Sequence, residues 1–306
     1  MIAEPTFPAG RGLAAVDTTA ALRRLARRPE PPWLHGEIAR RLGERLPFLT
    51  TAPRRILDWW AWQGQGAPVL AAAFPEAERI GVEPDAAHAA RAAAGARGPW
   101  WSRRRGPAPL LETADDVVLG RAQMVFAVRV LDFVADPAAL VRRWAGLLEA
   151  DGVLLVAALG PGSLPELRAL AAAEGWPVPP PPFVDMHDLG DLLVEAGFVE
   201  PVFDQETIRL TWPDGRAALA ELATWGGHLA PARFAGLRTP RWRERLAAAL
   251  DGRRDADGRV ALTLEVAYGH GFRGRPRAAP GEPVAIPLET LRDSLRRTGK
   301  PRDGAG

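Results

Sequence analysis

Strand-like apolar runs alternate with helix-like segments between residues 55 and 159, and this order limits the fold more than any other feature of the chain. The strand-like runs are Arg55–Trp60, Arg79–Pro84, Met124–Val130 and Val153–Leu159. The helix-like segments between them are Gln65–Phe74, Ala86–Ala94 and the stretch from Pro137 to Leu148. Such an alternation predicts a parallel sheet whose crossover helices cover its two faces.

The parts of the chain on either side of this alternation add mainly helices. Apolar residues at i+4 spacing predict an amphipathic helix over Leu34–Phe48, ahead of the first strand. Later, strand-like runs at Pro201–Trp212 and Arg259–Phe272 enclose a helical stretch. We therefore expect an open α/β sheet that ends in a hairpin-like pair of strands with a helical insertion between them.

Composition excludes several classes of function. The chain of 306 residues has no cysteine, which rules out disulfides, thiolate nucleophiles and cysteine-bound metals. No apolar run reaches the roughly 18 residues of a membrane span, so we expect no membrane contact. The first residues lack the basic-then-apolar layout of a secretory signal, and a cytoplasmic location is expected.

Arginine supplies nearly all the positive charge, because Lys300 is the only lysine. Arginine forks suit phosphates and carboxylates. Basic and aromatic side chains interleave only at Trp100–Arg105, so we expect no nucleic-acid partner. The arginines gather at residues 23–28, 103–105 and 238–245.

The carboxyl ends of the predicted strands define a candidate pocket, because open α/β sheets bind ligands there. Asp58–Gly66, Glu83 and Ala127–Asp132 should line it. Glu83 ends the second strand, where an acid can accept both hydroxyls of a ribose. Asp58 either orients the loop and a cofactor amine or is an ordinary turn acid. Glu83 has the corresponding alternative of a solvated acid at a strand end.

Tryptophans crowd the turn after the first strand, where a nucleotide-binding sheet would place glycines. Glycine lets the backbone come close to a cofactor because it has no Cβ, and indole rings cannot do that. Trp59, Trp60 and Trp62 occupy this turn, and only Gly64 and Gly66 remain. Either a cofactor is held differently here, or side chains have refilled the site.

Two further motifs carry weaker signals. Asp185–Asp191 contains several acids and His187, but the spacing predicts a helix N-terminal cap and no metal site. Gly160–Ser163 follows a strand and opens a helix, so it is either a loop near a ligand or only a turn. The chain has no Gly-x-Ser-x-Gly elbow and no phosphate-binding Gly-Lys-Thr/Ser turn, which argues against serine hydrolases and P-loop enzymes.

Several of these segments together resemble one protein family. The matching pieces are Leu34–Leu42, Ile56–Asp58, Gly81–Glu83, Leu159–Arg168, Phe183 with Asp185–Gly190, Glu195–Phe198 and Leu262–His270. They resemble class I S-adenosylmethionine-dependent methyltransferases, and specifically the malonyl-acyl-carrier-protein O-methyltransferases of biotin synthesis. The later signatures also resemble a mitochondrial complex I assembly factor reported as an arginine hydroxylase, which shares the fold but not the reaction.

The resemblance implies a Rossmann-like, seven-stranded methyltransferase sheet with N-terminal helices and a helical lid. The implied parts are an N-terminal cap (1–50), the core (51–212 and 258–274), the lid (213–257) and a C-terminal tail (275–306). The cofactor would be S-adenosylmethionine, bound by Asp58, Trp60, Gly64, Gly66 and Glu83.

The chain departs from the family at several positions of this pocket. Trp60 and Trp62 stand at glycine positions, and Gln123 stands where an aspartate starts the fourth strand. The stretch from Arg129 to Val134 replaces a family Asn-x-x-x-x-Trp pattern. An acid that contacts the adenine would be Glu112, Asp115 or Asp116.

The implied reaction is O-methylation of a malonyl-type free carboxylate on an acyl carrier protein or a small acidic substrate. An arginine would recognise the carboxylate by bidentate pairing. Arg129 is the preferred candidate, and Arg209 and Arg233 are the others. The arginine clusters could dock the acidic carrier protein. Two alternatives remain: a methyltransferase for another substrate, and a catalytically altered protein that acts as an assembly or binding factor.

Overall fold

The computed structural model describes residues 16–28, 30–95, 108–176, 183–227, 229 and 238–275. Met1–Gly274 form one compact unit, and Arg275–Gly306 form a second one. The first unit holds all the helices and strands described below. None of the helices in the described ranges is long and apolar enough to cross a membrane.

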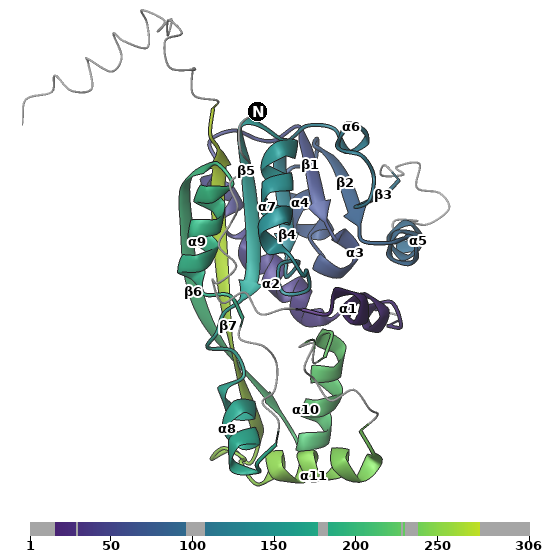
Figure 1. The fold of residues 1–306 in the computed structure, drawn as a ribbon, viewed down its shortest axis with the longest axis vertical. Helices are drawn as coiled ribbons and strands as arrows, with labels where there is room; N and C mark the ends of the chain where they lie inside the picture. The colour runs from purple at the N-terminus through teal and green to yellow at the C-terminus, as the bar shows by residue number, and fades with distance from the viewer. Residues whose placement is uncertain are drawn as a thin grey trace, which may run out of the picture. The chain divides into compact units, whose positions relative to one another are not determined.

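A single seven-stranded sheet organises the first unit, with the strand order β3-β2-β1-β4-β5-β7-β6 (Figure 1). Strands β1 to β5 pair in parallel, and β7 runs antiparallel to both of its neighbours. The expected α/β methyltransferase-type sheet is therefore confirmed. The strands are β1 (Arg55–Trp59), β2 (Glu78–Glu83), β3 (Leu110–Leu111), β4 (Ala122–Val128), β5 (Leu148–Leu159), β6 (Phe198–Trp212) and β7 (Val260–Arg273).

Helices cover both faces of the sheet, because successive residues of a buried strand point to opposite sides. Leu57 and Trp59 belong to the core on one face, with α1 (Thr18–Leu25), α7 (Pro137–Leu147) and α9 (Met186–Glu195). Ile56 belongs to the core on the other face. That core includes residues of α2 (Trp33–Gly43), α4 (Ala67–Ala73) and α8 (Pro165–Ala173). The remaining elements of this part are α5 (Ala86–Gly95), α6 (Asp116–Leu119) and the 3₁₀ turn η1 (Leu46–Phe48).

Between β6 and β7 the chain forms α10 (Gly215–Leu222), the 3₁₀ turn η2 (Ala223–Trp225) and α11 (Pro240–Asp251). These helices lie beyond the carboxyl ends of the parallel strands, where β6 and β7 extend past the rest of the sheet (Figure 1). The end of α1 is bonded to this insertion. Arg24 Nη1 donates to the Gly226 carbonyl over 3.2 Å, and Arg28 Nη2 donates to the Ala223 carbonyl over 2.8 Å.

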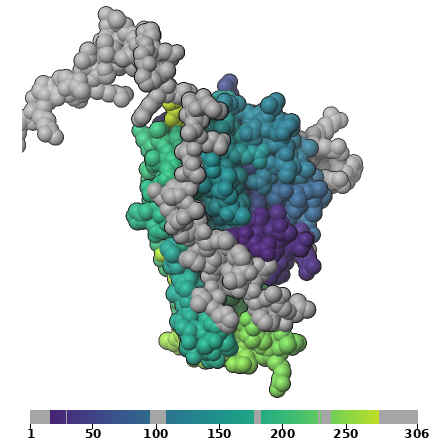
Figure 2. All heavy atoms as spheres, viewed as in Figure 1, coloured from purple at the N-terminus to yellow at the C-terminus, as the bar shows by residue number. Residues whose placement is uncertain are grey.

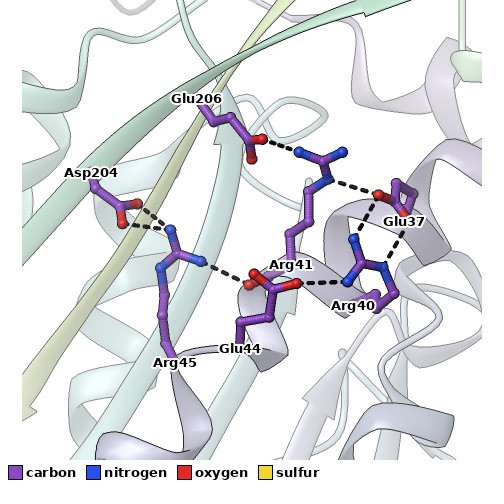
Figure 3. A network of polar contacts seen from close by, with 7 residues as sticks. All are labelled: Glu37, Arg40, Arg41, Glu44, Arg45, Asp204 and Glu206. Atoms are coloured by element: carbon purple, nitrogen blue, oxygen red, sulfur yellow. Dashed lines mark hydrogen bonds and ion pairs between the residues drawn. The ribbon is translucent and has the colours of Figure 1, made fainter.

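Ion pairs tie the outer face of α2 to strand β6 (Figure 3). Arg41 pairs with Glu206, and Arg45 pairs with Asp204. Within and just after the helix, Arg40 pairs with Glu37 at 2.9 Å and with Glu44 at 2.6 Å. These side chains are between 22% and 61% exposed, so the network acts as a surface connection between α2 and the edge strand. We call it the α2–β6 network, made of Glu37, Arg40, Arg41, Glu44, Arg45, Asp204 and Glu206.

The structure shortens several predicted elements at residues with positive φ. Strand β1 ends at Trp59 and not at Trp60, because Trp60 has φ 54°. The predicted helix Gln65–Phe74 begins only at Ala67, since Gln65 has φ 57°. Strand β4 stops before Arg129, whose φ is 58°. Strand β3 and helix α6 lie in a region where the sequence shows no clear pattern, and they were not predicted.

Candidate functional site

A single turn of helix, α3 (Ala61–Gly64), follows β1 at the carboxyl edge of the sheet. Left-handed residues flank it on both sides, Trp60 before it and Gln65 after it. The Trp60 amide donates to the Val82 carbonyl over 2.6 Å, and the Gly64 amide donates to the Trp60 carbonyl over 2.7 Å. The turn is thus fixed to β2 by its own backbone.

The first two tryptophans of the turn point into the protein. Trp59 and Trp60 are 0% and 1% exposed. Their indole nitrogens donate to the two oxygens of Glu112, over 3.1 and 2.8 Å. Trp59 packs edge-on against Trp144 of α7, whereas Trp60 lies beside Phe133, with ring centroids 6.2 Å apart. Side chains therefore pack over the carboxyl end of β1, as one of the two interpretations of this turn expected.

Glu112 is the acid of the region after β3 that reaches the turn. Asp116, a second candidate, pairs with Arg143 of α7 at 2.8 Å. Asp115 is the N-cap residue of α6, and its side chain makes no capping hydrogen bond. The structure thus brings Glu112 to the candidate site and places the other two acids at α6.

Two buried carboxyl groups lie under the turn. Glu83 is fully buried, and its Oε1 accepts the Trp62 amide over 2.8 Å. Its Oε2 is buried with no hydrogen-bond partner among the described residues. Burial raises the pKa of Glu83 to about 7, against the effect of the Trp62 amide. Burial and the neighbouring Glu83 also raise the pKa of Asp58 well above its usual value.

Of the two remaining glycines of the turn, Gly66 alone makes a close approach that a side chain would obstruct. A Cβ on Gly66 would lie 2.7 Å from a carboxylate oxygen of Asp58 and 2.8 Å from the Phe126 ring. A Cβ on Gly64 would lie 3.4 Å from Val128. Gly66 therefore leaves room for the Asp58 carboxyl group, whereas a side chain at Gly64 would make only an ordinary van der Waals contact with the end of β4.

Arg129 follows β4 and joins the same region from the other side. Its Nε donates to Asp132 over 2.7 Å, and its Nη1 lies 2.9 Å from His35 Nε2. Its guanidinium also lies 5.1 Å from the centre of the Phe133 ring. Burial raises the pKa of Asp132, although the Arg129 charge acts in the opposite direction.

His35 on α2 connects Arg129 to the turn, because its Nδ1 lies 3.0 Å from the Gln63 carbonyl. A carbonyl can only accept and a guanidinium can only donate, so His35 is neutral with its proton on Nδ1. Burial and the Arg129 charge lower the pKa of His35 well below 6.5.

This role of His35 was not predicted from the sequence, because the histidines were considered only as possible metal ligands. Its helical spacing to Ile38 and Leu42 was the available signal, because these positions share one face.

The other predicted arginines are not part of this cluster. Arg209 lies on β6, is 54% exposed and pairs with Asp255 at 2.6 Å. Arg209 pairs with Thr263 of β7. Asp204, five residues earlier on β6, pairs with Tyr268. The β5 partner of Tyr268 is Ala157, whose carbonyl accepts the Arg129 amide. Arg209 therefore lies away from Arg129 along the β6–β7 strand pair. Arg233 lies outside the described residues.

The two weaker motifs have structural roles. Asp185 caps α9, where its side chain accepts the His187 amide over 2.8 Å. Within the described ranges no cluster of three histidines or acids could hold a metal ion. Around Gly160–Ser163, the Gly162 amide and the Ser163 hydroxyl both donate to Glu265 of β7, each over 2.9 Å. These bonds join the loop after β5 to the neighbouring strand.

The sheet, with β7 antiparallel between β5 and β6 and buried acids at its carboxyl edge, defines a class I methyltransferase fold. It is similar to the crystal structure of the YcgJ protein from Bacillus subtilis, with a TM-score of 0.51 and 13% identity. That similarity covers 77% of this chain and 98% of the other. No protein-family model matches the sequence.

Curated proteins give a more specific assignment. The chain is 36% identical over 278 residues to a malonyl-acyl-carrier-protein O-methyltransferase of Laribacter hongkongensis, covering 87% of this chain and 88% of that protein. It is 35% identical to the protein of the same name from Halorhodospira halophila, covering 80% and 84%. The chain belongs to the malonyl-acyl-carrier-protein O-methyltransferase family.

Proposed function

We propose that this protein transfers a methyl group from S-adenosylmethionine to a free carboxylate of the malonyl-acyl-carrier-protein type, in biotin synthesis. The observation that carries the proposal is the 36% identity to a relative named for this reaction, along almost the whole chain. The cytoplasmic location stays a prediction.

The residues under the turn suit the cofactor at its ribose end. Glu83 Oε2 is buried without a hydrogen-bond partner in the described part of the chain, and it would accept a ribose hydroxyl. Asp58 and Glu83 form a pair of buried acids with raised pKa values, which a positively charged ligand would stabilise in their ionised forms. Gly64 and Gly66 complete the proposed cofactor site, whereas the Trp60 side chain stands in the same crevice and does not fit.

The reaction requires little acid–base catalysis from the protein. S-adenosylmethionine supplies a methyl group on a positively charged sulfur, and a carboxylate is already ionised near neutral pH. The protein must hold the carboxylate oxygen in line and exclude water from it. The carboxylate oxygen forms a bond to the methyl carbon as the bond from that carbon to sulfur breaks, so the products are a methyl ester and S-adenosylhomocysteine.

Arg129 is our candidate for recognising the carboxylate. Asp132 and His35 already take up Nε and Nη1, which fixes the plane of the guanidinium. The remaining Nη2 makes no hydrogen bond to any described residue, and it is the group left for a substrate oxygen. Arg209, on the exposed ribbon, remains the weaker candidate.

The acidic carrier protein would dock on exposed arginines near the insertion. Arg23 and Arg27 are exposed on and just after α1, and Arg241 and Arg243 are exposed on α11. Both helices are visible on the face shown in Figure 2, α1 in purple and α11 in light green. We propose this face as the carrier-protein surface.

The test is methyl transfer from S-adenosylmethionine to purified malonyl-carrier protein, followed by mass spectrometry of the carrier protein. Acetyl-carrier protein, which has no free carboxylate, is the control acceptor. We expect methyl ester on the malonyl form alone. Equal transfer to both acceptors, or none to either, would contradict the proposal. A second test is rescue of a biotin auxotroph that lacks the methyltransferase.

A further inference from the structure

Trp60 has a backbone conformation that glycine adopts readily, but it carries a bulky indole side chain. Its φ and ψ are 54° and 49°, in the left-handed region. A bulky residue rarely adopts this conformation, at a cost of about 1–3 kcal/mol, and it persists only where its surroundings hold it. The turn thus retains the geometry of a glycine loop while carrying an indole.

The indole of Trp60 lies at the carboxyl ends of the strands, where a fold of this kind forms its ligand crevice. Its ring plane is 20° from that of Phe133, which follows β4. Its Nε1 donates over 2.8 Å to Glu112, which follows β3. The ring therefore occupies space between the ends of β1, β3 and β4, where open α/β sheets bind their ligands.

The helical insertion between β6 and β7 lies against Phe133. A Cβ on Gly226 would lie 2.7 Å from the ring of Phe133, so the backbone after η2 lies directly against that ring. Phe133 cannot move back from Trp60 unless this backbone also moves. A ligand entering the crevice must therefore displace the indole itself or open the insertion.

Trp62 is a natural comparison in the same turn. Its ring lies edge-on to His88 with centroids 5.7 Å apart, and the Arg91 guanidinium lies 5.2 Å from its centre. Both partners belong to α5. Trp62 therefore also stands at a glycine position of the family, but its ring packs against α5 and not against Phe133 and Glu112.

We propose that the Trp60 indole is a plug in the cofactor crevice and must leave Phe133 and Glu112 before S-adenosylmethionine binds. The proposal rests on the proposed function. Only molecules with an open crevice can bind the cofactor. The apparent affinity is therefore reduced in proportion to the fraction of molecules that are open. Removing the indole should therefore tighten cofactor binding, although it removes a buried side chain.

The test is calorimetric titration of S-adenosylhomocysteine into the wild type, Trp60→Gly, Trp60→Asn and Trp62→Ala. Glycine and asparagine both tolerate the left-handed backbone, so the second variant serves if the first does not fold. We expect both Trp60 variants to bind at least about tenfold more tightly than the wild type. Trp62→Ala should bind as the wild type does.

The outcomes separate this proposal from the proposed function. Binding by the Trp60 variants but not by the wild type would support the plug. Equal or weaker binding by folded Trp60 variants would overturn the plug and leave the methyltransferase assignment intact. The same holds if Trp62→Ala tightens binding as much as Trp60→Gly. No binding by any of the four proteins would overturn both proposals.

Discussion

Helix α2 carries charged or polar contacts on two opposite faces, and their surroundings differ sharply. On the inner face, His35 contacts Arg129, which pairs with Asp132, and the side chains of that ion pair are each 4% exposed. On the outer face lies the α2–β6 network, where Arg45 and Asp204 are 22% and 61% exposed. Helix α2 thus lies beside a buried ion pair on one face and beside exposed ion pairs on the other.

The difference shows that burial, and not the number of contacts, decides how much an ion pair matters to the fold. A solvent-exposed pair gains little because water screens it, whereas breaking a buried pair leaves a charge without water or partner. The outer face has more ion pairs than the inner one, yet we expect the inner face to dominate the effect of mutations.

The largest effect is expected for Arg129→Met. This change leaves Asp132 buried without its cation and should lower the free energy of unfolding by about 3–5 kcal/mol. Urea denaturation followed by circular dichroism measures it.

The matched control is Arg45→Met in the α2–β6 network, which should cost much less. Adding Asp132→Leu to Arg129→Met removes both charges and should restore part of the loss. A similar cost for Arg129→Met and Arg45→Met would break the comparison.

A smaller effect is expected from the pH dependence of His35. Because its folded pKa is lowered, the native state keeps His35 neutral while the unfolded chain takes up a proton below about pH 6.5. His35 therefore costs stability progressively as the pH falls below about 6.5. His35→Gln should remove this part of the slope in urea denaturation, and equal slopes would contradict the prediction.

The smallest effect is expected at Arg45 and Asp204 in the α2–β6 network. A double-mutant cycle with Arg45→Met and Asp204→Asn should give a coupling of about 0.2–1 kcal/mol. The coupling should weaken further at high salt, because exposed charges are screened. A coupling as large as that between Arg129 and Asp132, or one insensitive to salt, would show that this pair is effectively buried.

The sequence predicted the sheet well. Apolar runs and helical spacing locate β1, β2, β4, β5 and β7, because continuous burial on both faces leaves a strong pattern. Asp58 and Glu83 were correctly placed at the carboxyl edge, since parallel strands end together there.

The details of the site depend on contacts between distant segments, which a single sequence does not display. Glu112 could not be separated from Asp115 and Asp116, because only the fold brings it to the two indoles. The contact of His35 with Arg129 joins residues 94 positions apart. The left-handed backbone at Trp60 and Arg129 also gave no signal, since neither residue type favours it.

Strand β7 has a consequence for the order in which the protein is made. It is the last strand of the described residues, yet it lies between β5 and β6. Until residues 260–273 leave the ribosome, β6 lacks the strand with which it pairs in the described structure, and the edge of β5 is open. Unpaired strand edges are prone to aggregation. A chain that stops before Val260 should therefore be captured by chaperones or precipitate, even though it contains every residue of the proposed cofactor site.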